Sequence, residues 1–419
     1  MSELIDNRQR RETLKQIILD IHQNKSPRKL KERFRELLSD VGATEIAALE
    51  QELIQEGLPP EEIKSLCDIH VSVFQESLDR QPQSQELGGH PIHTFRKENK
   101  AITQLVQTIR PILEQLLQKN NELNFKAKLE DWRSLHNQLL EIEKHYSRKE
   151  NILFAYLEKH GVSGPPKVMW GIQDDIRAQL KQISQSLSTT QGETDGLTKL
   201  IQTTALPALQ AIEDLIYKEE NIMFPMSMET LTDGEWAAVA EQSGEIGYTL
   251  VEPEHGWIPS APPGPSVDPG AFQKAPKGGK DGLQTLLPFE TGALTLGQIS
   301  LIFNHLPIDI TFVDEKDHVR YFSYGKERIF QRSKAIIGRN VKDCHPPDSV
   351  HIVTKIVSDF KSGKRDSAEF WIHMNEQYVY IQYFAVRDDD GTYRGTIEVT
   401  QDVQKIQTLQ GEKRIYSEE

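Results

Sequence analysis

Three glutamates lie on the apolar faces of segments that have the pattern of amphipathic helices. At about 100° per residue, Glu98, Glu150 and Glu219 fall within or beside the apolar stripes. Burying an unpaired carboxylate is costly, so each is expected to be paired with a base, protonated or bound to a metal. Inward carboxylates from several helices are how di-iron bundles build their sites. The alternative is that these glutamates pair with lysines such as Lys149 or Lys218 near one end of a bundle.

A second candidate metal site is the pair Cys67 and His70, which are three residues apart in a segment with helical spacing. Both lie on the apolar stripe of that segment, so they can face one point. A thiolate and an imidazole suit zinc or iron, although a closed zinc site takes about four ligands. His90 or His93 could supply the others. The alternative is a buried thiol beside a hydrogen-bonded histidine.

The other cysteine, Cys344, is followed by His345 and a Pro-Pro pair, and His351 lies nearby. Either histidine could bind a haem iron, and Cys344 could be a redox-sensitive thiol. The alternative is that the two prolines simply end one segment and start a helix near Ser349.

Several catalytic motifs are missing from the sequence. It has no phosphate-binding glycine loop, no HExxH zinc-protease motif and no nucleophile elbow. Nothing therefore supports a serine or cysteine hydrolase, and the sequence favours a role without its own catalytic output.

Composition narrows the classes further. The chain has 419 residues, with 49 basic and 63 acidic side chains and a formal net charge of −14. This acidity argues against nucleic acid as the main partner. No stretch approaches the roughly 18 consecutive apolar residues of a membrane helix. With only two cysteines, a disulfide framework is excluded and a cytoplasmic location is expected.

One change of composition divides the chain. Residues 252–290 contain eight of the 21 prolines and six of the 26 glycines, which predicts a linker. Before it, residues 1–80 predict a small helical domain and residues 86–248 a helical bundle. After it, residues 293–412 predict a domain that mixes strands and helices.

The bundle is predicted from the period of its apolar residues. From about residue 94 to 225, they recur at helical spacing in four long segments with short connections. Four amphipathic helices joined in this way pack most simply as an up-down four-helix bundle.

Beyond the linker the period of apolar residues changes to two. DITFVD and VRYFS flank a polar turn, and AEFWIHM, QYVYIQYFAV and YRGTIEVT follow a helical stretch from Ser349 to Phe360. This is the pattern of a small α+β domain, so the predicted fold class is multidomain, mainly α and then α+β. One sheet face, with Trp371, Tyr378 and Tyr380, could be a partner-docking or dimer surface.

Residues from about 90 to 230 resemble the hemerythrin-like, HHE cation-binding family. The stretches that resemble its four helices are, in order, FRKENKAITQLV, HYSRKENILFAYL, WGIQDDIRAQLK and YKEENIMFP. The resemblance implies two irons held by histidines and glutamates from all four helices.

The sequence departs from that ligand set at four positions. His145 and Glu219 match family ligands, Glu150 is a possible substitute, and Glu98 lies on the first helix beside the set. The resemblance therefore implies a bundle with a degraded di-iron site. The residues that replace three implied histidines and one implied glutamate are Asn99, Gln173, Leu215 and Lys149.

Nearly the whole chain outside the linker resembles prokaryotic proteins that join a domain-of-unknown-function-438 region, a hemerythrin-like bundle and a PAS domain. The supporting stretches are EIAALEQELIQEGL, LCDIHVSVF, GHPIHTFRKEN and CHPPDSVHIVTKIVSDFKSGK with the strands after it. PAS domains usually bind a small molecule, haem or flavin between their helices and the inner sheet face. The resemblance implies such a site near Cys344, His345 and His351.

The main hypothesis is a cytosolic sensor or regulatory protein. Its PAS domain would bind a small metabolite or haem, or sense redox state, and the bundle would relay that state to an unidentified protein partner. A homodimer through the PAS domain is a further expectation. One alternative is a non-haem protein that uses iron or another divalent metal to handle oxygen, nitric oxide or iron, with oxidoreductase activity as an option. Another is a structural scaffold.

Overall fold

The computed structural model describes two compact units, Met1–Gly264 and Pro265–Glu419. The predicted helical domain 1–80 lies almost wholly outside the described residues, and so do Cys67, His70 and the middle of the predicted linker. The described ranges are 88–118, 122–189, 194–254, 257–260, 285–325, 328–374 and 377–412, with a few positions between 12 and 56.

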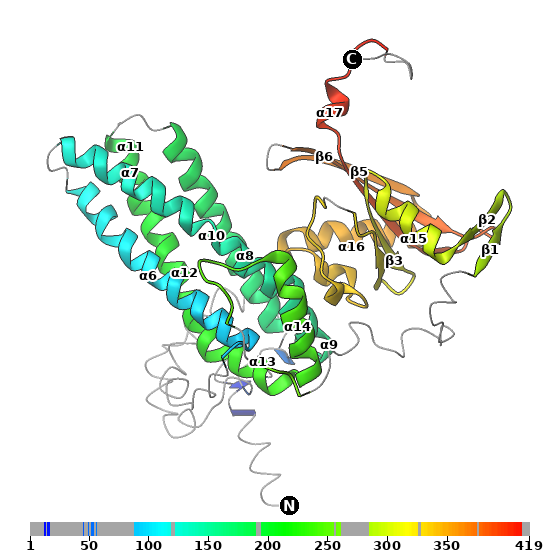
Figure 1. Ribbon diagram of the computed structural model, residues 1–419, viewed down its shortest axis with the longest axis horizontal. Helices are drawn as coiled ribbons and strands as arrows, with labels where there is room; N and C mark the ends of the chain where they lie inside the picture. The colour runs from blue at the N-terminus through cyan, green and yellow to red at the C-terminus, as the bar shows by residue number, and fades with distance from the viewer. Residues whose placement is uncertain are drawn as a thin grey trace, which may run out of the picture. The chain divides into compact units, whose positions relative to one another are not determined.

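The first unit contains the predicted up-down bundle, built of four rods of helix (Figure 1). The first rod is α6 (Pro91–Leu117), which begins where the Nδ1 atom of His90 accepts a hydrogen bond from the Ile92 amide at 3.1 Å. Its buried residues recur at helical spacing and confirm the predicted stripe. The second rod consists of α7 (Glu122–Leu139), α8 (Ile142–Arg148), a π-helical turn (Lys149–Leu153) and α9 (Phe154–Lys159).

The third rod is α10 (Gly164–Thr189), and the fourth rod follows it. Helix α6 packs against α7 and against α12 (Leu206–Lys218) of the fourth rod. Helix α12 in turn packs against α10. The core therefore runs along the middle of the bundle. The parts of the fourth rod are α11 (Thr194–Leu200), a π-helical turn (Ile201–Ala205), α12 (Leu206–Lys218), a second π-helical turn (Glu219–Met223) and α13 (Phe224–Thr230).

A fifth helix, α14 (Asp233–Ile246), was not predicted. It starts with a capping box, in which the Thr232 side chain and the Glu235 side chain each bond the other's backbone amide. The helix packs against α6 and α8 and buries Trp236. The chain then stays on the bundle, because Lys97 on α6 donates to Glu254 at 2.6 Å, inside the segment predicted as a linker.

The second unit is built on an antiparallel sheet of five strands in the order β4-β3-β7-β6-β5. The predicted strands are confirmed, and β6 and β7 pair as a hairpin across the turn at Gly391. The strands are β3 (Asp309–Asp314), β4 (Val319–Phe322), β5 (Ser367–Met374), β6 (Gln377–Arg387) and β7 (Tyr393–Asp402).

Helices and a small hairpin complete this unit (Figure 1). The hairpin of β1 (Leu286–Phe289) and β2 (Gly292–Thr295) starts inside the predicted linker, because apolar residues return there after the glycines end. Helix α15 (Leu296–His305) has no buried residue. The remaining helices are two 3-10 turns (Lys334–Ile336 and Val341–Cys344), α16 (Pro347–Lys361) and α17 (Gln404–Gln407).

Candidate functional site

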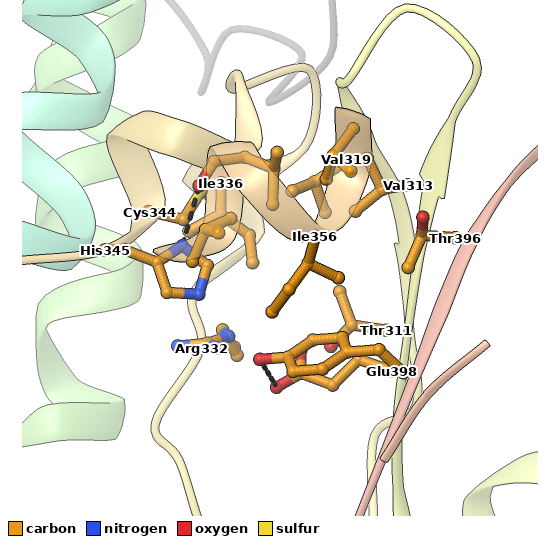
Figure 2. Close-up of a pocket in the computed structure, with 14 residues that line it drawn as sticks. Thr311, Val313, Val319, Arg332, Ile336, Cys344, His345, Ile356, Thr396 and Glu398 are labelled. Carbon is orange, nitrogen blue, oxygen red and sulfur yellow. Dashed lines mark hydrogen bonds between the residues drawn. The ribbon is translucent and has the colours of Figure 1, made fainter. Parts of the chain in front are cut away.

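The sheet unit holds a cavity of about 30 Å³ (Figure 2). It lies between one face of the sheet and a layer formed by the two 3-10 turns and α16. Period-two alternation brings Thr311, Thr396 and Glu398 to this face, because β3 and β7 pair in the register Thr311↔Glu398. The apolar wall of the cavity is Val313, Val319, Ile336, Val341, Val353, Ile356 and Val357.

Polar groups gather at one end of this cavity. Figure 2 shows the His345 ring and the Arg332 side chain there, with Glu398 across from them. The Tyr383 hydroxyl donates to Glu398 at 3.5 Å. This end of the cavity therefore offers an imidazole, a guanidinium, a phenol and a carboxylate to a bound molecule.

His345 is held in one orientation by the backbone. Its Nδ1 atom lies 2.7 Å from the Val341 carbonyl oxygen, which can only accept, so Nδ1 carries the proton. Burial lowers the pKa of His345, which keeps the ring neutral and leaves Nε2 as an acceptor. Burial also raises the pKa of Tyr383, so its hydroxyl stays a donor.

The structure brings two of the three residues predicted for this cofactor site to the cavity. Cys344 lines it with a half-buried thiol, whose Sγ atom lies 3.6 Å from the Asn340 carbonyl oxygen. His351 does not line it and is exposed on α16. Arg332, Tyr383 and Glu398 were missed. The strand alternation could have placed Tyr383 and Glu398 on the inner face.

A second cluster of ionisable groups is buried inside the bundle. The His145 ring, on α8, lies 2.8 Å from Glu98 Oε2 through Nδ1 and 3.0 Å from Glu219 Oε2 through Nε2. All three side chains are 0–1% exposed. Three of the four residues predicted as metal ligands in the bundle therefore converge, with both glutamates as hydrogen-bond partners of His145.

Two cations complete this cluster. The guanidinium of Arg148 donates to Glu98, and the ammonium of Lys149 donates to Glu219. Arg148 also lies between the rings of Phe95 and Tyr248, 4.4 and 4.6 Å from their centroids. We call Glu98, His145, Arg148, Lys149 and Glu219 the interior ion cluster.

The charges of the interior ion cluster stabilise one another. Burial alone would raise the pKa of Glu219, but Lys149 and His145 outweigh it and lower this pKa to about 2. Glu219 is therefore ionised at neutral pH. An ionised carboxylate only accepts hydrogen bonds, so the nitrogen of His145 that bonds it must donate and has no lone pair to offer.

Glu150, the fourth predicted metal ligand, faces a different cation. Its two carboxylate oxygens accept hydrogen bonds from Arg177 on α10 at 2.7 and 2.9 Å. Burial raises the pKa of Glu150 to about 7 against the opposing charge of Arg177. In the amide orientation that satisfies both neighbours, Gln173 donates to Glu150 and accepts from Lys149 at 3.0 Å.

Both π-helical turns beside this cluster begin at one of its charged residues, Lys149 or Glu219. Single π-helical turns inside α-helices are frequent at functional sites.

Among the described residues, the histidines offered as further ligands for Cys67 have other roles. His90 caps α6, and His93 lies 3.9 Å from Glu254.

Three family models match the chain. They are the family of unknown function DUF438 over residues 14–80, the hemerythrin HHE cation binding domain over residues 90–227 and a PAS domain over residues 299–404. No curated protein matches the chain. No helix among the described residues is both long enough and apolar enough to span a membrane.

Several solved structures are similar to part of the chain. The C-terminal domain of a Streptococcus mutans protein is 35% identical over 30% of this chain and 99% of that one, with a TM-score of 0.30. The PAS domain of a Colwellia psychrerythraea protein is 18% identical over 26% and 98%, with a TM-score of 0.22. A sensory box sensor histidine kinase from Vibrio cholerae is 14% identical over 26% and 92%, with a TM-score of 0.20.

The hemerythrin match implies a di-iron centre, but the residues inside the bundle do not fit one. Asn99, Gln173 and Leu215 are all buried in the bundle, but none is a histidine or carboxylate. The carboxylates of the interior ion cluster already bond Arg148 and Lys149. Within the described ranges, no three His, Cys, Asp or Glu side chains are placed to hold a metal ion.

Proposed function

Because the chain belongs to the proteins that combine a DUF438 region, a hemerythrin HHE domain and a PAS domain, we propose that it is a sensor or regulatory protein. The PAS and hemerythrin domains support this role. In our proposal the signal is a small molecule bound in the cavity beneath α16, with oxidation of Cys344 as a second trigger. Its place of action is the cytosol.

The observation that carries the proposal is the composition of that cavity. Its wall is apolar, and Arg332, His345, Tyr383 and Glu398 offer polar groups from one end. Ligand sites in proteins typically combine an apolar lining with a few polar groups that fix orientation. Arg332 and Glu398 carry opposite charges, which favours a ligand that is neutral overall and both donates and accepts hydrogen bonds.

The size of the cavity links binding to a change of shape. One water molecule needs about 10–15 Å³ of such a cavity, so about 30 Å³ holds only about two waters. A metabolite can therefore enter only if α16 and the sheet move apart, and haem would need a far larger separation. A ligand that binds the open form shifts the population toward it, and we propose that this shift is relayed to the helical unit and a protein partner.

A screen of small metabolites by thermal unfolding of the full-length protein tests the proposal. Ile356→Trp fills the cavity from α16, whereas Ile352→Trp puts the same side chain at a position 44% exposed on that helix. We expect a compound that raises the unfolding temperature of the wild type and of Ile352→Trp, but not of Ile356→Trp. If every compound that stabilises the wild type also stabilises Ile356→Trp, the cavity is not the ligand site.

A further inference from the structure

The second and fourth rods of the bundle contain equivalent segments. Their π-helical turns read KENIL (Lys149–Leu153) and EENIM (Glu219–Met223). The third residue of each turn has the same role, since the amide of Asn151 donates to the Ser147 carbonyl at 2.9 Å and that of Asn221 to the Tyr217 carbonyl at 2.8 Å. Lys149 and Glu219 are therefore structural counterparts.

The second residues of the two turns also correspond. Glu150 bonds Arg177 on α10, and Glu220 bonds Arg96 on α6 at 3.0 Å. Both turns thus direct their second residue to an arginine of a neighbouring helix. The two segments differ in charge at the first position, where the fourth rod has a carboxylate and the second rod has an ammonium.

These first residues meet in the centre of the bundle. Lys149 donates to Glu219, and both residues are 0% exposed. With Glu98 and Arg148, the carboxylates and the Lys and Arg cations of the interior ion cluster are equal in number. A buried carboxylate that stays ionised must be neutralised by an adjacent positive charge, which can be a metal ion or a protein cation. Here the cation comes from the chain itself.

We infer that the ammonium of Lys149 takes the place of a divalent metal ion at the centre of the bundle and keeps the centre closed to metals. A shorter side chain with a lone pair at position 149 would leave room for a cation whose ligand bonds are about 2.0–2.2 Å. That cation would then be bound by residue 149, Glu219 and the Nε2 atom of His145, while Glu98 stays on the Nδ1 side of the ring. This inference is independent of the proposed PAS function.

Two substitutions test the inference, Lys149→His and Lys149→Glu, with zinc as the probe. Zinc content is measured by elemental analysis after equilibration of full-length protein with ZnCl₂ and gel filtration. Because Cys67 and His70 could bind zinc elsewhere, the readout is the difference from the wild type. We expect about one additional zinc per chain in each variant, lost again when His145→Ala is added.

The control is Lys144→Glu, which changes the charge of an α8 lysine that is 43% exposed and bonds Glu141. It should bind no more zinc than the wild type. If Lys149→Glu folds only with zinc, circular dichroism with and without a chelator shows it, and that result supports the inference. If Lys149→Glu does not fold at all, the zinc content of Lys149→His, which adds no negative charge, decides the test.

Two results would overturn the inference. One is a folded Lys149→His protein that binds no more zinc than the wild type. The other is a wild type whose bound zinc falls when His145→Ala is introduced, because Lys149 would then not exclude the metal.

Discussion

His145 bonds a buried carboxylate through each ring nitrogen, and each carboxylate also bonds a cation from the next turn of the same rod. Glu98 comes from the first rod and Glu219 from the fourth, so this cluster joins three of the four rods. Removing one member leaves a charge buried and unpaired, which typically costs several kcal/mol. The cluster therefore stabilises one particular packing arrangement of these three rods.

The loss of unfolding free energy at acid pH should reflect the protonation of Glu219. Its pKa is about 2 in the folded protein against an ordinary value of 4.5, so its ionised form stabilises the fold above pH 4.5. This contribution, of roughly 3 kcal/mol, is lost as the pH falls from 4.5 toward 2. Glu219→Gln cannot titrate, so the difference in unfolding free energy between wild type and variant should shrink over that range.

Denaturant unfolding followed by far-UV circular dichroism measures this difference. Glu241→Gln, which changes an exposed carboxylate of α14, is the control and should keep a constant difference from the wild type. A Glu219→Gln protein whose difference from the wild type does not change between pH 4.5 and 2 would contradict the assignment.

Sequence reasoning predicted part of this cluster. The apolar stripe showed that Glu98 and Glu219 face inward, and the alternative of a lysine partner is confirmed for Glu219 by Lys149. Arg148 and Arg177 were missed as partners of Glu98 and Glu150. A position on a helix gives the direction of a side chain, but not which long, flexible cation reaches it from another turn or another helix.

At the scale of elements, the pairing of β3 with β7 shapes the floor of the PAS cavity. Gly395 begins the part of β7 that pairs with β3 and has a φ of +150°, and a Cβ there would lie 2.3 Å from the Val313 carbonyl oxygen. No side chain fits this approach. The next residue, Thr396, lines the cavity, so strain here would reach the ligand site.

Gly395→Ala should therefore destabilise the sheet unit by about 1–3 kcal/mol and weaken ligand binding. Gly292 is a matched control, because its φ is +151° and a Cβ there would meet nothing within 4 Å. Differential scanning calorimetry of both variants separates the clash from the backbone preference. Equal loss of stability in Gly395→Ala and Gly292→Ala would show that the contact with Val313 does not matter.

Elements with a long, regular apolar period were predictable from the sequence, as the bundle rods and the five main strands show. Two elements were missed for identifiable reasons. The buried face of helix α14 carries small alanines and the polar Gln242 and Ser243, so it shows no clear apolar stripe, although its Thr232–Glu235 capping box was a readable signal. The β1–β2 hairpin is short and adjoins a proline-rich and glycine-rich stretch.

At the scale of the whole molecule, the outer sheet face is our proposed contact with a second copy of the chain. Trp371 on β5 is 59% exposed and lies opposite Tyr380 of β6. Exposed apolar patches often mark an interface. Trp371→Glu should convert a dimer to a monomer in sedimentation velocity.

Tyr324→Glu is the control for that experiment, because Tyr324 is similarly exposed, at 55%, but lies outside the strands. It should leave the dimer intact. A wild type that sediments as a monomer at every concentration would remove this proposal.

The central claim is that a ligand bound in the PAS cavity changes the conformation of the helical unit. Hydrogen–deuterium exchange of the full-length chain, with and without a compound from the thermal screen, measures this directly. We predict altered exchange in the helical unit as well as in α16, in the wild type but not in Ile356→Trp. Changes confined to the residues that line the cavity would contradict a regulatory role and leave a binding module without a relay.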